Sequence, residues 1–328
     1  MDWQSIYGHD RIKKDLQELM QRGRMPHALL FCGTEGIGKS LTAKVLAKSL
    51  LCSDPHEGAP CGICRSCRAF EEGSHPDFFY LEPEEGKAVK VIKIEQIRRM
   101  QSALSLSPAL SGRRAIVIDG AEYMNETSVN SLLKTLEEPS GETYFILVSA
   151  HKEMLLPTVL SRCTKIYFAP LRDEETAGIL AERGISPDKA DIIARLSGGS
   201  VSRALNFIDS DALKLRSQAL SLWEGKLTDR YILEQTDELG SLERRQISLW
   251  ASFVQQILRD LLLLSDGIST SLLCNRDIEN ELFRIAGSSG RYSLLQKLSL
   301  TEQLISRLNS NAEARLLLQN FLLQWRKS

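Results

Sequence analysis

Apolar runs of strand length alternate with helix-like patterns through the first half of the chain. The runs occupy residues 28–32, 78–81, 115–119, 144–149 and 164–168. Between them, apolar residues recur three or four positions apart, which is the spacing of one helix face. The clearest faces contain Leu41, Val45, Leu46 and Leu50, then Ile94, Ile97, Met100 and Leu104, then Val129, Leu132, Leu133 and Leu136. Alternating strands and helices predict an α/β domain with five strands.

Weaker patterns fill the gaps between these elements. They predict an amphipathic helix within residues 5–25, a polar loop at 82–90 and a short helix at 152–160. Pro170 marks the end of the α/β pattern. Residues 171–208 then predict two or three short helices, because glycines and a proline interrupt the apolar spacing.

The last part of the chain, from about residue 212 to residue 328, predicts helices only. Apolar residues at 249, 253, 257 and 261 recur every four positions. The final segment, 316–325, carries apolar residues over a wide arc, which is typical of a helix buried in a bundle. The pattern leaves open whether that bundle lies within this chain or includes partner subunits.

The composition is that of a soluble globular protein. The 328 residues are 43% hydrophobic and 25% charged, which suits two or three domains. The net charge is −1, so any contact with nucleic acid has to come from a local basic patch. No run of 18 uncharged apolar residues occurs, which predicts no membrane span. The first residues lack a basic region followed by an apolar core, so we expect a cytoplasmic protein.

A glycine-rich loop joins the first predicted strand to the helix that follows it. The loop fits G-x-x-x-x-G-K-[ST] with Gly33, Thr34, Glu35, Gly36, Ile37, Gly38, Lys39 and Ser40. Glycines let the backbone turn its N–H groups toward a phosphate at the positive end of a helix. We expect Lys39 to reach the β- and γ-phosphates of bound ATP or ADP, and the Ser40 hydroxyl to bind Mg²⁺. A glycine-rich turn with a chance lysine is the alternative, and the flanking strand and helix argue against it.

Four cysteines follow the P-loop helix. Cys52, Cys61, Cys64 and Cys67 have the spacing C-x8-C-x2-C-x2-C, which suits a closed tetrahedral Zn²⁺ site with a structural role. Disulfides are the alternative, but a reducing compartment keeps thiols free. We expect the nearby His56 and His75 to lie on the surface. Cys32, Cys163 and Cys274 have no metal-ligand spacing, and we expect them to be packed thiols.

The third predicted strand ends in a carboxylate. Downstream of a P-loop, Asp119 at this strand end is typical of the Walker B aspartate, which is oriented toward Mg²⁺. ATPases of this type often have a glutamate at the next position to orient the attacking water, and here that residue is Gly120. Glu122 lies two residues further on, where strand-to-loop geometry makes it a poor substitute.

Two further segments carry a family resemblance. Residues 130–139 read NSLLKTLEEP, and residues 160–163 read LSRC. With residues 27–31, the P-loop and the four-cysteine insert, they make residues 5–208 resemble clamp-loader subunits of the AAA+ class. The resemblance implies a P-loop domain with a parallel five-stranded sheet at 1–169, carrying the zinc insert at 52–67. It further implies a small helical lid at 170–210 and an all-helical collar at 211–328, although the last segment matches no motif.

The resemblance also implies a mechanism. Such subunits form a ring-like pentamer within a bacterial DNA polymerase holoenzyme, which opens a sliding clamp and places it on primed DNA. ATP lies between neighbouring subunits, and the arginine of the Ser-Arg-Cys sequence, here Arg162, acts in trans on the neighbour's γ-phosphate. The implied partners are gamma/tau and delta subunits, the sliding clamp and primer–template DNA, with no membrane. The alternative for Arg162 is a salt-bridged arginine at a strand edge.

Two departures from the motor subunits of this family refine the expectation. Gly120 stands where a motor subunit has its catalytic glutamate, and Ala150 stands where a threonine or asparagine contacts the γ-phosphate. Arg203, in the lid's sensor segment, lies one place late. We therefore expect a non-motor subunit that binds nucleotide and hydrolyses it weakly or not at all. One alternative is an active gamma/tau-like motor. The other is a zinc-containing nucleic-acid-binding module, and the near-zero net charge disfavours this second alternative.

Overall fold

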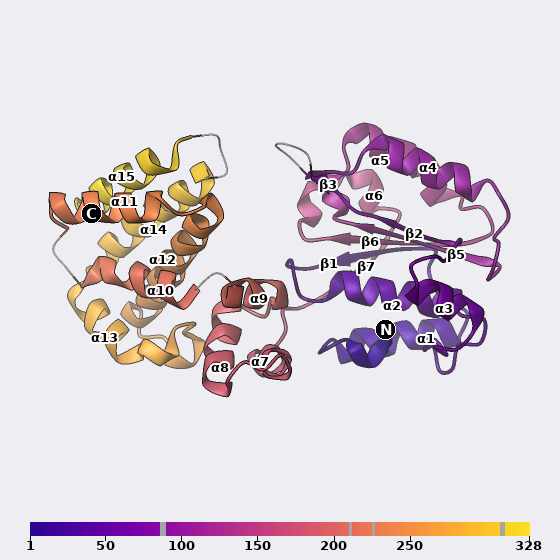
Figure 1. Ribbon diagram of the computed structural model, residues 1–328, viewed down its shortest axis with the longest axis horizontal. Helices are drawn as coiled ribbons and strands as arrows, with labels where there is room; N and C mark the ends of the chain where they lie inside the picture. The colour runs from indigo at the N-terminus through magenta and orange to yellow at the C-terminus, as the bar shows by residue number, and fades with distance from the viewer. Residues whose placement is uncertain (86–89, 210–211, 225–226, 309–311) are drawn as a thin grey trace. The chain divides into compact units, whose positions relative to one another are not determined.

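The computed structural model describes the chain apart from residues 86–89, 210–211, 225–226 and 309–311. The described residues form two compact units, drawn in Figure 1. The first contains Met1–Ile179 and Gly199–Ser202, and the second contains Leu180–Gly198 and Arg203–Ser328. Part of the predicted loop at 82–90 and the predicted lid–collar boundary at 210 and 211 lie outside the described residues. The division into P-loop domain, lid and collar stays a prediction.

A parallel five-stranded sheet forms the centre of the first unit. Its strands, in spatial order, are β2 (Phe78–Leu81), β5 (Arg113–Asp119), β6 (Glu142–Ser149), β1 (Ala28–Cys32) and β7 (Thr164–Tyr167). All four neighbouring pairs are parallel. All five predicted strands are present, and the fold class expected from the AAA+ resemblance is confirmed.

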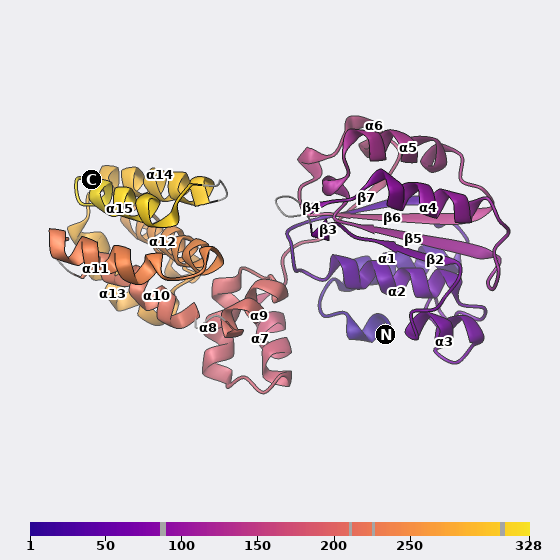
Figure 2. The same ribbon diagram turned by 45° about the horizontal axis from the view of Figure 1, so that its top comes forward.

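Helices cover both faces of this sheet (Figure 2). One layer contains α1 (Asp10–Gln21), α2 (Lys39–Leu51) and α3 (Arg65–Glu71), and the other contains α4 (Ile94–Leu104), α5 (Glu126–Glu137) and α6 (Pro157–Leu160). Alternate strand residues supply the two cores, because successive side chains point to opposite faces. Leu29 and Phe31 pack in the first core, whereas Leu30 packs in the second. Strands buried on both faces explain the continuous apolar runs in the sequence.

Two predicted segments differ from the structure. The loop predicted at 82–90 contains a short antiparallel pair, β3 (Glu84–Glu85) and β4 (Lys90–Val91). The helix predicted at 152–160 is two pieces, the 3₁₀ turn η3 (Lys152–Met154) and the helix α6. Leu156 precedes Pro157 and is extended, with ψ 140°, because a proline disfavours the helical conformation in the residue before it. Further 3₁₀ turns are η1 (Trp3–Ser5) and η2 (Ala121–Tyr123).

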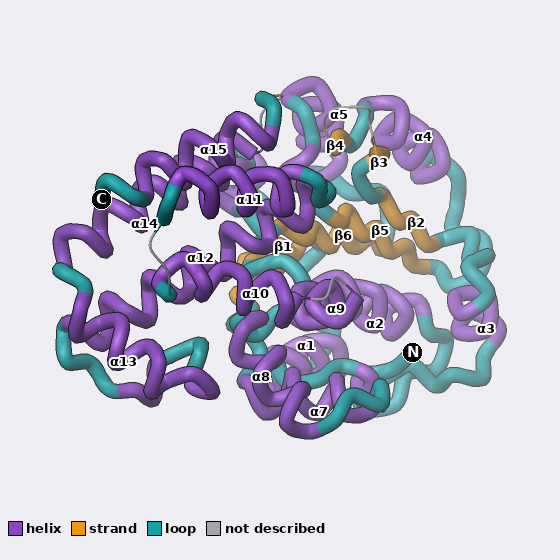
Figure 3. Tube along the Cα trace, turned by 60° about the vertical axis from the view of Figure 1, so that its left-hand side comes forward, coloured by secondary structure: helices purple, strands orange, loops and turns teal. Residues whose placement is uncertain are grey.

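The second unit is helical (Figure 3). It contains α8 (Pro187–Ser197), α10 (Ala212–Leu220), α11 (Asp229–Gly240), α12 (Arg244–Ser265), α13 (Glu279–Ser288), α14 (Arg291–Leu308) and α15 (Ala314–Trp325), with the 3₁₀ turns η4 (Ser221–Trp223), η5 (Thr270–Leu272) and η6 (Arg276–Ile278). Helices α7 (Asp173–Glu182) and α9 (Val201–Asp209) contain residues of both units. Phe321 and Trp325 of α15 are buried, and α15 packs on α11 and α14. The apolar face of the last segment is therefore largely covered within this chain.

Helix α12, with 22 residues, is the longest described helix of the second unit. Among the described residues it is the one helix long and apolar enough, by length and composition, to cross a membrane. Half of that apolar stretch is buried, and Trp250, Phe253 and Ile257 are fully enclosed by the other helices. The core helix of a bundle has the same composition, so α12 is weak evidence for a membrane span.

Asp77 fixes the turn that leads into strand β5. Its carboxylate is 3% exposed and accepts backbone N–H groups of Ala109 at 2.7 Å, Leu110 at 2.8 Å and Ser111 at 3.3 Å. Burial alone would raise the pKa of Asp77, but the three N–H donors outweigh burial and hold the pKa below its usual value. The folded-state pKa is lower than the unfolded one, so the stabilisation is present above the unfolded pKa of about 3.9. It is lost as the pH falls through the folded pKa.

We expect Asp77→Asn to lower the free energy of unfolding by about 1–3 kcal/mol at pH 7, because an amide NH₂ group cannot accept the backbone hydrogens. Asp191→Asn, which changes an exposed carboxylate, is the matched control and should have little effect. Urea unfolding at pH 7 and at about pH 3 tests this, since the difference from wild type should shrink on acidification. An equal difference at both pH values would show that the carboxylate charge is not what stabilises the turn.

Candidate functional site

The predicted phosphate-binding loop lies between β1 and α2, at the carboxyl edge of the sheet. All of β1 is buried, and α2 begins at Lys39 with Gly38 as its N-cap. Lys39 is 5% exposed as a residue, and its ammonium donates to the carbonyl oxygens of Gly33 at 2.7 Å and Thr34 at 2.6 Å. Burial lowers the pKa of Lys39, and the nearby carboxylates of Glu122 and Asp119 oppose that shift. A buried cation thus lies within the loop where a phosphate would bind.

A short segment from the start of α9 packs on the tip of this loop. Gly36 has φ +78°, and a Cβ there would lie 2.5 Å from the Ser200 hydroxyl oxygen, so only glycine fits. The Val201 N–H donates to the Gly36 carbonyl at 2.9 Å, and the Ser200 hydroxyl donates to the Glu35 carbonyl at 2.8 Å. The loop conformation is therefore held by hydrogen bonds from this segment as well as by Lys39.

Asp119 ends β5 at the same edge of the sheet. Its Oδ2 accepts the Tyr80 hydroxyl from the neighbouring strand β2 at 2.6 Å. The Lys44 ammonium of α2 lies 4.0 Å from the centre of the Tyr80 ring. Burial and the Asp119 carboxylate both raise the pKa of Tyr80, which keeps the hydroxyl protonated as a donor. The structure thus brings the predicted Mg²⁺-facing carboxylate next to the P-loop helix and adds Tyr80, which the sequence pattern marked only as a strand residue.

The backbone after Asp119 explains the absence of a glutamate there. Gly120 has φ +72°, in the left-handed region that favours glycine. A Cβ at this position would lie 2.8 Å from Cδ2 of Tyr123 and 3.1 Å from Cγ of Pro83. A glutamate at residue 120 would need both a strained backbone and movement of these neighbours.

Glu122 lies in the 3₁₀ turn η2, which follows Gly120. Its side chain is buried, with 8% of the residue exposed, and its Oε1 accepts the Ala150 backbone N–H at 2.8 Å. Ala150 follows β6 directly, and β6 pairs with β1 so that Ser149 lies opposite Cys32, just before the P-loop. The structure therefore brings Glu122 and Ala150 together beside the phosphate-binding loop.

Arg162 lies after α6 and contacts α5. Its guanidinium forms a salt bridge with Glu137, with Nε 2.7 Å from Oε1. One terminal nitrogen also donates to the Thr158 carbonyl at 2.8 Å. The Arg162 side chain is 32% exposed and the Glu137 side chain 47% exposed. Arg162 is thus held at the surface, and its hydrogen bonds within the described chain go to α5, to α6 and to Ser161, which follows α6.

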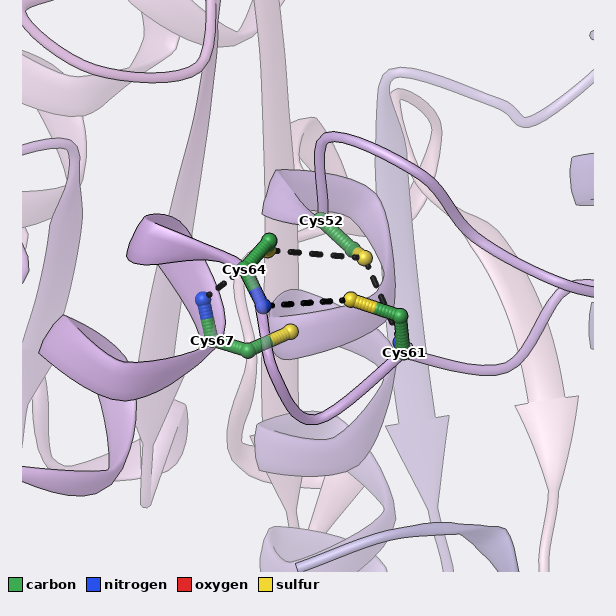
Figure 4. A group of neighbouring side chains, drawn as sticks. All are labelled: Cys52, Cys61, Cys64 and Cys67. Carbon is green, nitrogen blue, oxygen red and sulfur yellow. Dashed lines mark hydrogen bonds between the residues drawn. The ribbon is translucent and has the colours of Figure 1, made fainter.

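The four predicted metal ligands converge at the end of α2 (Figure 4). The sulfur atoms of Cys52, Cys61, Cys64 and Cys67 all lie within 4.8 Å of one another. All four are free thiols in the structure. Backbone N–H groups donate to three of the sulfurs, from Cys61 to Cys52 at 3.3 Å, from Cys64 to Cys61 at 3.4 Å and from Cys67 to Cys64 at 3.3 Å. Four sulfurs at this separation, stabilised by N–H donors, fit a tetrahedral zinc site.

The electrostatics of the cluster favour a thiolate at one position. Burial alone would raise the pKa of Cys64, but the backbone N–H donors of Cys67 and Ser53 oppose it and lower the pKa to about 6. Burial raises the pKa of Cys52 and of Cys67. A Cys64 thiolate is therefore available at neutral pH to begin metal binding.

His75 is buried, so its predicted surface position is wrong, whereas His56 is exposed as expected. The His75 Nε2 lies 2.8 Å from the Ser66 hydroxyl, which donates to the Leu51 carbonyl at 2.6 Å. The Asp77 N–H donates to Nδ1 of His75 at 3.1 Å, and burial lowers the pKa of the ring. A neutral His75 therefore links α3 to the end of α2 and supports the cysteine cluster without belonging to it.

Comparison with known proteins gives consistent matches. Residues 8–172 match the family described as DNA polymerase III, delta subunit. The DNA polymerase III subunit delta' of Pseudomonas aeruginosa is 36% identical over 206 residues, which are 62% of this chain and 62% of that protein. The subunit delta' of Bacillus subtilis is 29% identical over 321 residues, covering 95% of this chain and 94% of that protein.

A second kind of relative also matches. The DNA polymerase III subunit tau of Escherichia coli is 31% identical over 257 residues, which are 76% of this chain and 38% of that protein. The chain thus matches the Bacillus protein over nearly its full length, but it covers less than two thirds of the Pseudomonas and Escherichia coli proteins.

Proposed function

The chain belongs to the DNA polymerase III delta subunit family, and we propose on that premise that it is a non-motor, delta-prime-type subunit of a clamp loader. In this role it binds ATP or ADP, donates Arg162 to a neighbouring ATPase subunit and helps load a sliding clamp on primed DNA. Its partners are gamma/tau and delta subunits, the clamp and primer–template DNA, in the cytoplasm. It is part of a DNA-directed DNA polymerase holoenzyme, with little or no hydrolysis of its own.

The Gly120 backbone carries the non-motor assignment. The P-loop and Asp119 supply groups for nucleotide and Mg²⁺, which neutralises phosphate charge when it is bound. The left-handed Gly120 conformation disfavours the water-orienting glutamate of a motor, and the Ala150 N–H is already bonded to Glu122. The chain's own residues can therefore hold a nucleotide without assembling the groups that activate water.

A gamma/tau-like motor is the competing function, favoured by the intact P-loop and the match to tau. The two are separated by measuring ATP hydrolysis of the isolated chain and then of a complex reconstituted with candidate partners. We expect very slow hydrolysis alone and clamp loading that requires this chain. A fast rate in isolation would favour the motor, and loading that proceeds equally without the chain would contradict both.

We also propose that Cys52, Cys61, Cys64 and Cys67 bind one structural Zn²⁺. Their sulfurs use every ligand position, so the ion would hold the insert between α2 and α3 rather than react.

Purified protein should contain about one zinc per chain. Cys64→Ser should lose the metal and lower the free energy of unfolding by several kcal/mol, because zinc binding and folding are coupled. Cys274→Ser, which lies outside the cluster, is the matched control and should keep its zinc. Metal analysis by mass spectrometry and thermal unfolding with and without chelator make the test. Absence of zinc in protein never exposed to chelator would refute the site.

A further inference from the structure

Glu122 has one carboxylate oxygen that the fold does not use. Its Oε1 accepts the Ala150 N–H at 2.8 Å, whereas its Oε2 is buried and has no hydrogen-bond partner in the part of the chain described here. Leaving a buried polar atom unpaired costs free energy. The hydrogen bond to Ala150 explains why Oε1 is buried. It does not explain the burial of Oε2, which points to a role of Glu122 in the neighbouring site.

The position of Glu122 relative to the P-loop follows from the sheet. Glu122 lies in η2, three residues after the end of β5, and its side chain reaches the residue after β6. Strand β6 pairs with β1 in register, Ser149 opposite Cys32, so Ala150 lies beside the start of the P-loop. The Glu122 carboxylate therefore lies beside the loop that contains Lys39, the cation expected to meet the terminal phosphates.

This arrangement has a different effect on ADP and on ATP. The γ-phosphate adds negative charge and needs hydrogen-bond donors or cations around it. Ala150 has no side-chain donor, and its backbone N–H already donates to the Glu122 carboxylate. A negative charge therefore stands where a donor would stabilise the γ-phosphate, and in a partly buried site this repulsion is weakly screened.

We propose that Glu122 determines the nucleotide preference of the site by disfavouring the γ-phosphate, so that the chain binds ADP more tightly than ATP. This inference rests on the proposed nucleotide site at residues 33–40. It gives the non-motor role a physical cause, because a subunit that keeps ADP can present Arg162 to its neighbour without passing through a hydrolysis cycle of its own.

The test is the affinity of the full chain for Mg²⁺-ADP and for a Mg²⁺-bound, non-hydrolysable ATP analogue, measured by calorimetry. Wild type should bind ADP about tenfold more tightly than the analogue, a difference within reach of one partly screened charge. Glu122→Gln keeps an acceptor for the Ala150 N–H and removes the charge, so analogue affinity should rise about tenfold while ADP affinity changes less than about threefold. Glu153→Gln, at an exposed carboxylate nearby, should behave as wild type.

Four results separate the possibilities. Wild-type affinity for the analogue equal to or above that for ADP overturns the inference. Weaker binding of both ligands to Glu122→Gln also overturns the inference, because that result would mean that Glu122 supports Mg²⁺ or the loop itself. Glu122→Ala, checked for folding by thermal unfolding, must shift the ratio of ADP affinity to analogue affinity in the same direction as Glu122→Gln. ADP binding that is absent in wild type, or that survives Lys39→Ala, refutes the nucleotide site itself and is thereby distinguished from failure of the Glu122 role.

Discussion

Lys39→Ala is expected to abolish nucleotide binding by this chain. Lys39 is buried, and its ammonium is held by the Gly33 and Thr34 carbonyls in the loop. A phosphate entering the loop would replace these neutral acceptors with charged ones, and charge-assisted hydrogen bonds are about twice as strong. Removing the ammonium leaves the N–H groups at the start of α2 as the main attraction for phosphate. We expect affinity for Mg²⁺-ADP to fall by about 100-fold or more, which corresponds to roughly 2.8 kcal/mol.

The same substitution also affects the stability of the loop itself, and this has to be measured separately. Without Lys39, the two loop carbonyls lose their donor, which costs about 1–3 kcal/mol if water cannot reach them. Thermal unfolding of Lys39→Ala and of Lys14→Ala, an exposed lysine in α1, establishes whether the variant is folded at the assay temperature. Calorimetry at fixed Mg²⁺ then reports binding. A folded Lys39→Ala protein that binds ADP with wild-type affinity would show that the P-loop is not the nucleotide site.

The strands whose bounds the sequence predicted best are those that are apolar to both ends, β1 and β2. Strand β1 is buried at every residue, and its apolar run predicted its bounds correctly. Strand β5 begins two residues earlier than predicted, at Arg113. Arg114 is 4% exposed and donates to the Leu104 carbonyl, a partner ten positions away that no local pattern contains. An apolar run therefore fails to predict the first residues of a strand when these residues are charged.

The missed residues of the candidate site share one property. Glu122, Tyr80 and His75 are defined by partners from other elements. No local pattern around Glu122 indicates its partner, and only the pairing of β5 with β6 and of β6 with β1 explains how Glu122 reaches Ala150. The P-loop and the cysteine cluster, by contrast, are local in sequence, so spacing alone was enough to predict that their members would converge.

Arg162 is expected to act on a neighbour's ATP while having little effect on its own chain. Its salt bridge with Glu137 joins two partly exposed side chains, and such pairs stabilise a fold by about 0–1 kcal/mol. Arg162→Ala should therefore fold normally and keep its own nucleotide affinity within about twofold, because its hydrogen bonds within the described chain go to α5, α6 and Ser161 rather than to the P-loop.

The Glu137 contact suggests how the arginine is presented. Glu137 and the Thr158 carbonyl fix the guanidinium at the surface after α6. This reduces the side-chain entropy that Arg162 loses when the guanidinium binds a γ-phosphate. In an assembled complex the phosphate would compete with Glu137 for the guanidinium. Glu137→Gln should leave the arginine in place but weaken that competition, so its complexes should hydrolyse ATP at least as fast as wild type. This variant distinguishes the effect of the arginine from the effect of the salt bridge.

The decisive experiment uses complexes in which this subunit alone carries the change. An arginine finger supplied in trans is worth about 10³–10⁵ in rate at the site it serves, so Arg162→Ala should remove the DNA-stimulated hydrolysis that depends on this subunit and impair clamp loading. Arg162→Lys should recover little, because lysine lacks the planar fork that contacts two phosphate oxygens. Arg11→Ala, at an exposed arginine in α1, controls for loss of surface charge. If complexes containing Arg162→Ala assemble, hydrolyse ATP and load clamps at the wild-type rate, the guanidinium only forms a surface salt bridge and is not an arginine finger.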